Sequence, residues 1–142
     1  IQLKKYEFLD HTADVKFLAY GKTLAEAFAN AAIASYDVMT DAKKVKAVEE
    51  KTIKVTSKKK ESLLYDFLEE LIVLTDIEGF LLSKVKAIEI KENKSNFQLK
   101  ATILGDNGDN YDVHTYIKSV TYSDMFIKET PTQTTLQVVH DI

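Results

Sequence analysis

Apolar side chains recur along this chain at two different spacings, and each spacing predicts a type of element. In residues 15–20, Val15, Phe17 and Ala19 fall on one side of the chain and their neighbours on the other, the period of two expected of a β-strand. Other apolar stretches have the length of strands and end at turn-forming residues. We therefore predict strands at residues 6–9, 15–20, 52–56, 81–90, 97–104, 117–128 and 134–139.

A spacing of three and four residues predicts two helices. The first carries apolar and small side chains from Leu24 to Met39, and its pattern stops near residue 40. It starts with a capping box, because Thr23 is followed three residues later by Glu26. The second helix runs from about Lys60 to Asp76 and ends before Gly79.

The order of these elements, β-β-α-β-α-β-β-β-β, is typical of the α+β class. We expect a two-layer sandwich, a mainly antiparallel sheet with the two helices packed on one face. One proline and four glycines among 142 residues predict short connections, and we expect residues 1–142 to form a single domain. Asn107-Gly108 predicts a hairpin turn with positive φ. The order of the strands within the sheet cannot be read from the pattern.

Composition and charge narrow the functional classes. The net charge is −3 and the sequence pI is about 5.6, so stable, independent binding to nucleic acid is not expected. The runs Lys43-Lys44 and Lys58-Lys59-Lys60 are interpreted as solvated surface. With no cysteine, the chain can form neither a disulfide framework nor a thiolate metal site. It has no stretch of the ~18 apolar residues that a membrane span requires and no signal-peptide pattern, so we expect a cytoplasmic protein without membrane contact.

Two aspartates near opposite ends of the chain carry the most informative chemistry. Asp14 closes the motif Asp-His-Thr-Ala-Asp that begins at Asp10, and Asp141 precedes the final residue, Ile142. If the last strand pairs beside the second and runs to its end, two side-chain carboxylates and the α-carboxylate converge. Such a cluster repels itself unless a cation or protons neutralise it. Oxygen ligands alone predict Ca²⁺, with Mg²⁺ or Mn²⁺ as alternatives, rather than Zn²⁺.

Simpler interpretations remain open for the same residues. A polar Asp-His-Thr turn commonly bonds its own backbone, in which case His11 is a hydrogen-bonded turn histidine and Thr12 a backbone partner. The chain end is open to interpretation as a frayed tail. The acidic loop at residues 106–112 does not match an EF-hand, because position twelve is Ile117 where a glutamate is needed. No nucleophile–base pair or nucleotide-binding motif is evident, so a conventional enzyme is not expected.

Several segments together point to a known family. The most specific runs from Tyr6 to Val15 and reads Tyr-Glu-Phe-Leu-Asp-His-Thr-Ala-Asp-Val. Further matching segments are residues 20–28, Met39-Thr40-Asp41, residues 61–64, residues 117–122 and the closing Asp141-Ile142. In this order, and over essentially the whole chain, they resemble the archease family, small proteins that assist the GTP-dependent tRNA-splicing RNA ligase.

The resemblance implies an α+β fold, a metal site formed by Asp14, Asp141 and Ile142, and a role as a non-catalytic protein cofactor. That role is to promote guanylylation of the ligase's active-site histidine and to permit multiple turnovers in tRNA splicing. Among the departures from the family pattern, His140 stands at an often apolar position. Four further residues are candidates for support of the ligands or for contact with the partner: Asp10, His11, Thr12 and Glu26.

Two other functional classes stay open. A metal-dependent hydrolase would use an ion at Asp14 and Asp141 to activate water, with His11 as a proton shuttle. A chaperone-like or RNA-binding module would use the basic runs, and its binding would fall steeply with salt. The negative net charge favours the partner-cofactor hypothesis over both.

Overall fold

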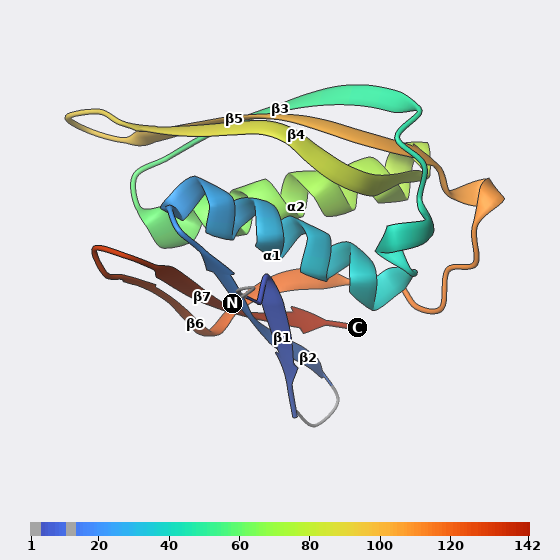
Figure 1. Ribbon diagram of the computed structural model, residues 1–142, viewed down its shortest axis with the longest axis horizontal. Coiled ribbons are helices and arrows are strands. Elements are labelled where there is room, and N and C mark those ends of the chain that lie inside the picture. Colours follow the sequence, from blue (N-terminus) through green and yellow to red (C-terminus); the bar gives the residue numbers. More distant parts are fainter. Residues whose placement is uncertain (1–3, 11–13) are drawn as a thin grey trace.

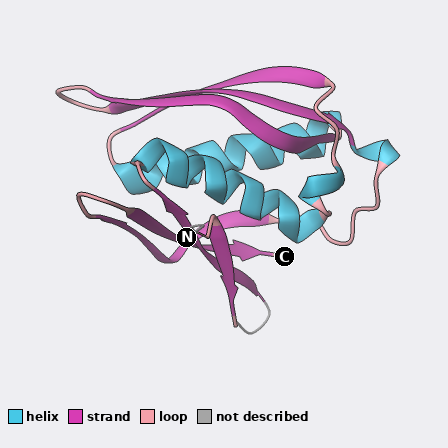
Figure 2. Cartoon of the chain, in the orientation of Figure 1, coloured by secondary structure: helices cyan, strands magenta, loops and turns pink. Residues whose placement is uncertain are grey.

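The computed structural model describes residues 4–10 and 14–142. The described residues form seven strands and two α-helices, with two short 3₁₀ helices, η1 and η2, in the connections (Figure 2). In chain order the elements are β1 (Tyr6–Leu9), β2 (Asp14–Gly21), α1 (Leu24–Met39), η1 (Ala42–Lys44), β3 (Glu49–Ser57), α2 (Lys60–Glu78), β4 (Phe80–Glu92), β5 (Phe97–Asn107), η2 (Gly108–Asn110), β6 (Ser119–Glu129) and β7 (Thr134–Asp141).

The strands form two antiparallel sheets, and both helices lie between them (Figure 1). One sheet has the order β1-β2-β7-β6, and the other has the order β3-β5-β4. The predicted α+β class and antiparallel pairing are confirmed, but the expected two layers are three. The reason lies in the helices: α1 packs on β2 and β7 and also on β4, while α2 packs on β3 and β5 and also on β6. A helix that is apolar on two sides is stable only when both sides are covered.

The pairing of β2 with β7 brings the two ends of the chain together. Their register is unbroken from Asp14 opposite Asp141 to Gly21 opposite Thr134. Because β6 pairs with the other edge of β7, the last strand is central in its sheet and bonded on both sides. On the face toward the helices, Phe17 and Val138 are opposite each other and fully buried. The apolar alternation predicted for residues 15–20 is therefore the alternation that sets this register.

The element boundaries follow the sequence prediction with local differences. Thr23 caps α1 as predicted, accepting a bond from the Glu26 amide at 3.1 Å, but the Glu26 carboxylate accepts from the Lys22 amide at 3.4 Å. Gly79 ends α2 in the left-handed region with φ 69°. The positive φ expected at Asn107-Gly108 is wrong, since residues 108–110 form η2 instead of a hairpin turn. That segment leads away from β5 toward the other sheet, so no tight hairpin is needed there.

A buried hydroxyl joins the two helices. Tyr36 on α1 is fully buried, and its hydroxyl donates to the Leu71 carbonyl oxygen at 2.9 Å and lies 2.7 Å from the Thr75 hydroxyl on α2. Nearby, Phe28 of α1 stacks on Phe67 of α2 with ring centroids 6.2 Å apart. The helix layer is therefore fixed by one polar link inside an apolar contact.

Replacing Tyr36 by Phe should lower the free energy of unfolding by about 1 kcal/mol, because the buried hydrogen bonds are lost while the ring remains. Urea denaturation measures the change. Tyr116→Phe is the matched control, since that ring is 57% exposed and its variant should unfold like the parent. Equal stability of the Tyr36 variant and the control would show that the hydroxyl contributes nothing to the link.

Candidate functional site

Asp14 and Asp141 lie directly opposite each other at the end of the β2–β7 ladder. Residues opposed in an antiparallel pair have Cα atoms roughly 4.5–5.5 Å apart and side chains on the same face. Ser119 of β6 continues this row on the other side of Asp141. Asp14 is half-buried and Asp141 is exposed, so the row lies at the rim of the sheet, open to solvent. Like charges directly opposed destabilise a strand pair, and a bound cation reverses that effect.

The segment that follows β7 is held in place. The Lys118 amide donates to the Asp141 carbonyl oxygen at 2.7 Å, and Ile142 is half-buried and packs against the hydrophobic core. Ile142 therefore lies against the molecule beside the aspartate pair. The alternative interpretation, that residues 141–142 form a frayed tail, is therefore wrong.

His140 anchors the last strand on the opposite face of the sheet. Because side chains alternate along a strand, His140 points toward the helices while Asp141 points away from them. The ring is fully buried, its Nε2 atom lies 2.8 Å from the Ser35 hydroxyl on α1, and its centroid lies 5.5 Å from that of Phe17. Ser35 donates to the Ala31 carbonyl oxygen at 2.9 Å, which assigns the imidazole proton to Nε2.

Burial sets the charge of this histidine. Removal from water lowers the pKa of His140 from 6.5 to about 4, so the ring is neutral at physiological pH. Its Nδ1 atom has no hydrogen-bond partner within the described residues. Sequence reasoning noted the unusual position but gave His140 no role, because only the fold shows that it contacts α1. The sequence did contain a signal for a buried role: a histidine stands at an apolar position of the alternating pattern, two residues before the last residue.

The other predicted site residues fall in three places. Asp10 is exposed and follows β1 at the end of the sheet that carries Asp14. His11 and Thr12 lie outside the described residues. Glu26 is in the first turn of α1, beyond the Gly21 end of β2, and a strand of that length spans roughly 23 Å at about 3.3 Å per residue. The fold therefore brings Asp14, Asp141 and Ile142 together and leaves Glu26 at the far end of the strand.

The donor set fits a hard cation. Within residues 4–10 and 14–142, no three His, Cys, Asp or Glu side chains are grouped so that they could hold a metal ion. The expected set has only two carboxylate side chains, Asp14 and Asp141, and draws its third donor from the carboxylate of Ile142. All of these donors are oxygens, which suit Ca²⁺ or Mg²⁺ and not a thiolate- or imidazole-seeking metal.

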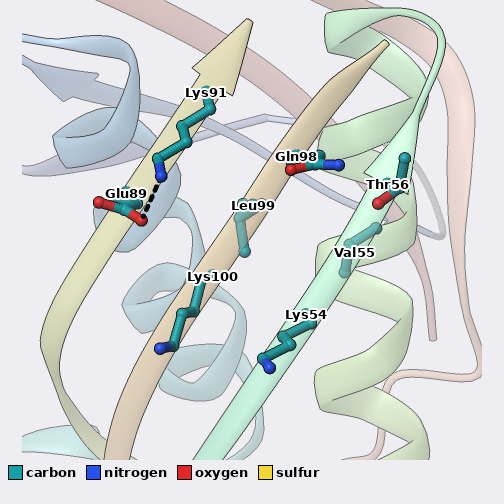
Figure 3. Close-up of a pocket in the computed structure, with 8 residues that line it drawn as sticks. All are labelled: Lys54, Val55, Thr56, Glu89, Lys91, Gln98, Leu99 and Lys100. Atoms are coloured by element: carbon teal, nitrogen blue, oxygen red, sulfur yellow. Dashed lines mark ion pairs between the residues drawn. The ribbon is translucent and has the colours of Figure 1, made fainter. Parts of the chain in front are cut away.

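A shallow depression lies on the other side of the molecule. It measures about 430 Å³ and occupies the face of the β3-β5-β4 sheet that points away from the helices (Figure 3). Lys54 and Lys100 lie opposite each other there, and Lys91 forms an ion pair with Glu89 at 3.7 Å. This surface is basic and open, with no nucleophile beside a base. It belongs to neither the aspartate pair nor a catalytic constellation.

No helix within the described residues has both the length and the apolar character needed to cross a membrane.

Comparison with known proteins decides the family. A profile described as the Archease protein family (MTH1598/TM1083) matches residues 6–142, nearly the whole chain. The chain belongs to the archease family. Its archease relatives include a protein from Methanosarcina mazei, 41% identical over 99% of this chain and 98% of that protein. Another, from Thermococcus kodakarensis, is 39% identical over 91% of this chain and 92% of that protein.

Solved archease folds agree with the architecture. The solution structure of Methanobacterium thermoautotrophicum protein 1598 superposes with a TM-score of 0.84 at 36% identity, covering 99% of this chain and 100% of that one. An archease of Thermotoga maritima, described as a possible chaperone, gives a TM-score of 0.58 at 19% identity over 94% of each chain. The second likeness concerns the fold alone.

His140 predicts a pH dependence of stability. Between its folded pKa of about 4 and its unfolded pKa near 6.5, the unfolded state binds the proton and the folded state does not. Stability from this group is therefore present above pH 6.5 and is lost as the pH falls toward 4, by about 3 kcal/mol in total. Urea denaturation in the presence of a chelator, from pH 4 to 7, should show this slope.

His140→Leu is the comparison, because it keeps an apolar side chain at the position and removes the titration. The difference in unfolding free energy between parent and variant should shift with pH over the same window. A difference that stays constant from pH 4 to 7 would contradict the assignment of a neutral buried imidazole.

Proposed function

We propose that this protein is a metal-binding accessory protein that activates the GTP-dependent tRNA-splicing RNA ligase. It promotes guanylylation of the ligase with GTP and multiple turnover in tRNA splicing or RNA repair, and it performs no catalysis of its own. Membership of the archease family supports this role, together with one observation: Asp14 and Asp141, from opposite ends of the chain, lie directly opposite each other at an exposed rim. The proposal retains the cytoplasmic address expected from the sequence.

Asp14, Asp141 and Ile142 would hold the metal. We favour Ca²⁺, because a site built from segments distant in sequence suits a cation that tolerates irregular geometry, with Mg²⁺ or Mn²⁺ as alternatives. A bound divalent cation supplies positive charge that offsets the carboxylates at the end of the ladder. The supporting feature in this chain is the packing of Ile142 against the core, which keeps the last residue beside the aspartates.

The chain's own residues define how such a site acts on a partner. The row of Asp14, Asp141 and Ser119 forms an acidic rim at the end of the sheet, and Asp10 lies at the same end. A rim of this kind complements a positively charged nucleotide pocket. If it binds the guanylylation-competent form of the ligase more tightly than the other forms, it shifts the ligase toward that form. His140 and Ser35 act as positioning residues, because their contact fixes the strand that carries Asp141.

Metal binding can be tested without the ligase. Ca²⁺ at 100 times its dissociation constant should stabilise the folded protein by about 2.7 kcal/mol, seen as a rise in the thermal midpoint over a chelator-treated sample. Asp14→Asn and Asp141→Asn should lose this rise. A variant extended by one glycine after Ile142, which displaces the α-carboxylate, should weaken it. The matched control is Asp109→Asn, an exposed aspartate of η2. If Ca²⁺ raises the thermal midpoint of the Asp14 and Asp141 variants as much as that of the Asp109 control, the proposed metal site is refuted.

Activation is tested with the cognate ligase, GTP and Mn²⁺ or Mg²⁺. The parent protein should accelerate guanylylation of the ligase. Asp14→Asn and Asp141→Asn should each reduce that acceleration by about tenfold or more, the lower range known for loss of a group that supports a metal site. Circular dichroism checks that the variants fold. A double variant that activates the ligase fully would contradict the proposed role of the aspartate pair.

A further inference from the structure

The four edge positions of the two sheets are not equally protected. β1 has only four residues, β4 has register shifts between Leu82 and Lys84 and between Val85 and Ala87, and β6 has one between Thr121 and Phe126. Short strands and bulges are devices that prevent pairing with another chain. β3 has neither, since its nine residues keep one unbroken register with β5. Its charged side chains, a third such device, are of both signs and so can pair with each other across two copies. Within the described residues, β5 is its only strand partner, so its other edge is open for pairing.

The surface beside this edge combines apolar and charged side chains where it meets α2. A groove of about 330 Å³ runs between β3 and α2. Its apolar lining residues are Ile53, Val73, Leu74 and Ile77, and charged side chains of both strand and helix also line it: Lys51, Lys54, Glu70 and Glu78. Ile77 is 77% exposed and Val73 is 42% exposed. These two exposed branched side chains lie beside the straight open edge, where a second chain paired with β3 would cover them.

We propose that β3 pairs antiparallel with β3 of a second copy of this chain, which makes one continuous six-stranded sheet. The pleat of β3 limits how this can occur. Glu50, Thr52 and Lys54 are exposed on the face away from the helices, while Ile53 and Val55 face them. If both copies keep their helices on the same side of the joint sheet, residues that point away from the helices in one copy lie opposite residues that point away from them in the other. The two-fold axis then passes between one residue of β3 and the same residue of the second copy.

Charge selects the position of that axis. An axis at Lys51 or at Lys54 places two identical lysines opposite each other, which is unfavourable. An axis at Ile53 creates no charge pair, because Glu50 then opposes Thr56. An axis at Thr52 places Glu50 of each copy opposite Lys54 of the other, which gives two pairs of opposite charge. Strand β3 is therefore complementary to itself in one register, with Thr52 at its centre.

The monomer leaves Lys54 in an unfavourable place. Lys54 lies opposite Lys100 of β5 (Figure 3), and Lys100 has Glu89 of β4 on its other side. None of the ion pairs found within the described residues involves Lys54. Glu50 from the other copy would supply a carboxylate for it. Glu50 itself forms an exposed ion pair with Lys86 at 3.1 Å, which can persist because a carboxylate accepts bonds at both oxygens.

The dimer leaves the aspartate pair accessible. β3 lies on one side of the helix layer, and the end of the chain lies on the other (Figure 1). Each dimer would therefore present two acidic rims on its outer surfaces. A single strand pair with a few apolar side chains makes a small interface, so we expect association that depends on protein concentration.

Sedimentation velocity over a concentration series tests the pairing. The parent protein should shift from monomer to dimer as its concentration rises. Glu50→Lys and Lys54→Glu should each remain monomeric, because each places like charges opposite each other twice. Lys54→Glu faces Lys100 in its own sheet, so this variant should stay folded, as circular dichroism would show. Lys128→Glu is the control: it makes the same charge change on β6, and it should dimerise like the parent.

The decisive sample mixes the two single variants. One copy then carries lysine at 50 and 54 and the other carries glutamate at both, so a heterodimer should form although neither variant dimerises alone. The double variant Glu50→Lys/Lys54→Glu should also dimerise. A Lys54→Glu variant that dimerises like the parent, or a mixture that does not associate, would overturn this register. A parent protein that stays monomeric throughout would overturn the dimer and leave the edge to an extended segment of another protein.

Discussion

The pairing of β2 with β7 is the constraint on which the rest of the structure depends. It closes the chain's first long strand against its last, in one register over eight residues. A slip of one residue would turn every side chain of β7 to the other face, placing Asp141 among the helices and His140 in solvent. The buried ring of His140 and its contact with Ser35 oppose that slip. The same register that buries the histidine therefore places Asp141 opposite Asp14.

The helix layer explains why this small chain can support two sheets. α1 carries several buried alanines, which let it approach strands on both sides, and α2 carries larger buried side chains such as Leu64 and Phe67. The Tyr36 hydroxyl joins the two helices inside this layer. Each sheet thus has one face on the helices and one face in water. The acidic rim and the open β3 edge belong to different sheets, so a metal ion at the rim and a second chain at the edge can bind without contact between them.

Local structure could be predicted from the sequence because it follows from neighbouring residues. The period of two in residues 15–20, the cap at Thr23 and the end of the second helix at Gly79 all depend on residues a few positions apart, and the structure has each of them. The convergence of Asp14 and Asp141 was stated on the condition that the last strand pairs beside the second, and the pairing of β2 with β7 meets that condition. Whether the pair holds a cation stays a prediction.

What could not be predicted depends on contacts between distant segments. Alternation says which face of a strand is buried but not which strand is its neighbour, so two sheets could not be distinguished from one. The role of His140 was missed for the same reason, because its partner Ser35 lies on a helix far away in sequence. Glu26 was named as a candidate for support of the ligands or for contact with the partner, yet the full length of β2 separates it from Asp14.

Two places in the molecule oppose like charges across a strand pair: Asp14 with Asp141, and Lys54 with Lys100. Opposed like charges weaken a ladder, and a sequence selected for stability alone would avoid them. Natural proteins break such local rules mainly where function requires it. At the first place the charges are carboxylates at an exposed rim, which a cation would satisfy. At the second, Lys54 lies on the strand with the open edge, where a carboxylate from another chain would pair with it. Both proposals rest on this one argument, and each can fail without the other.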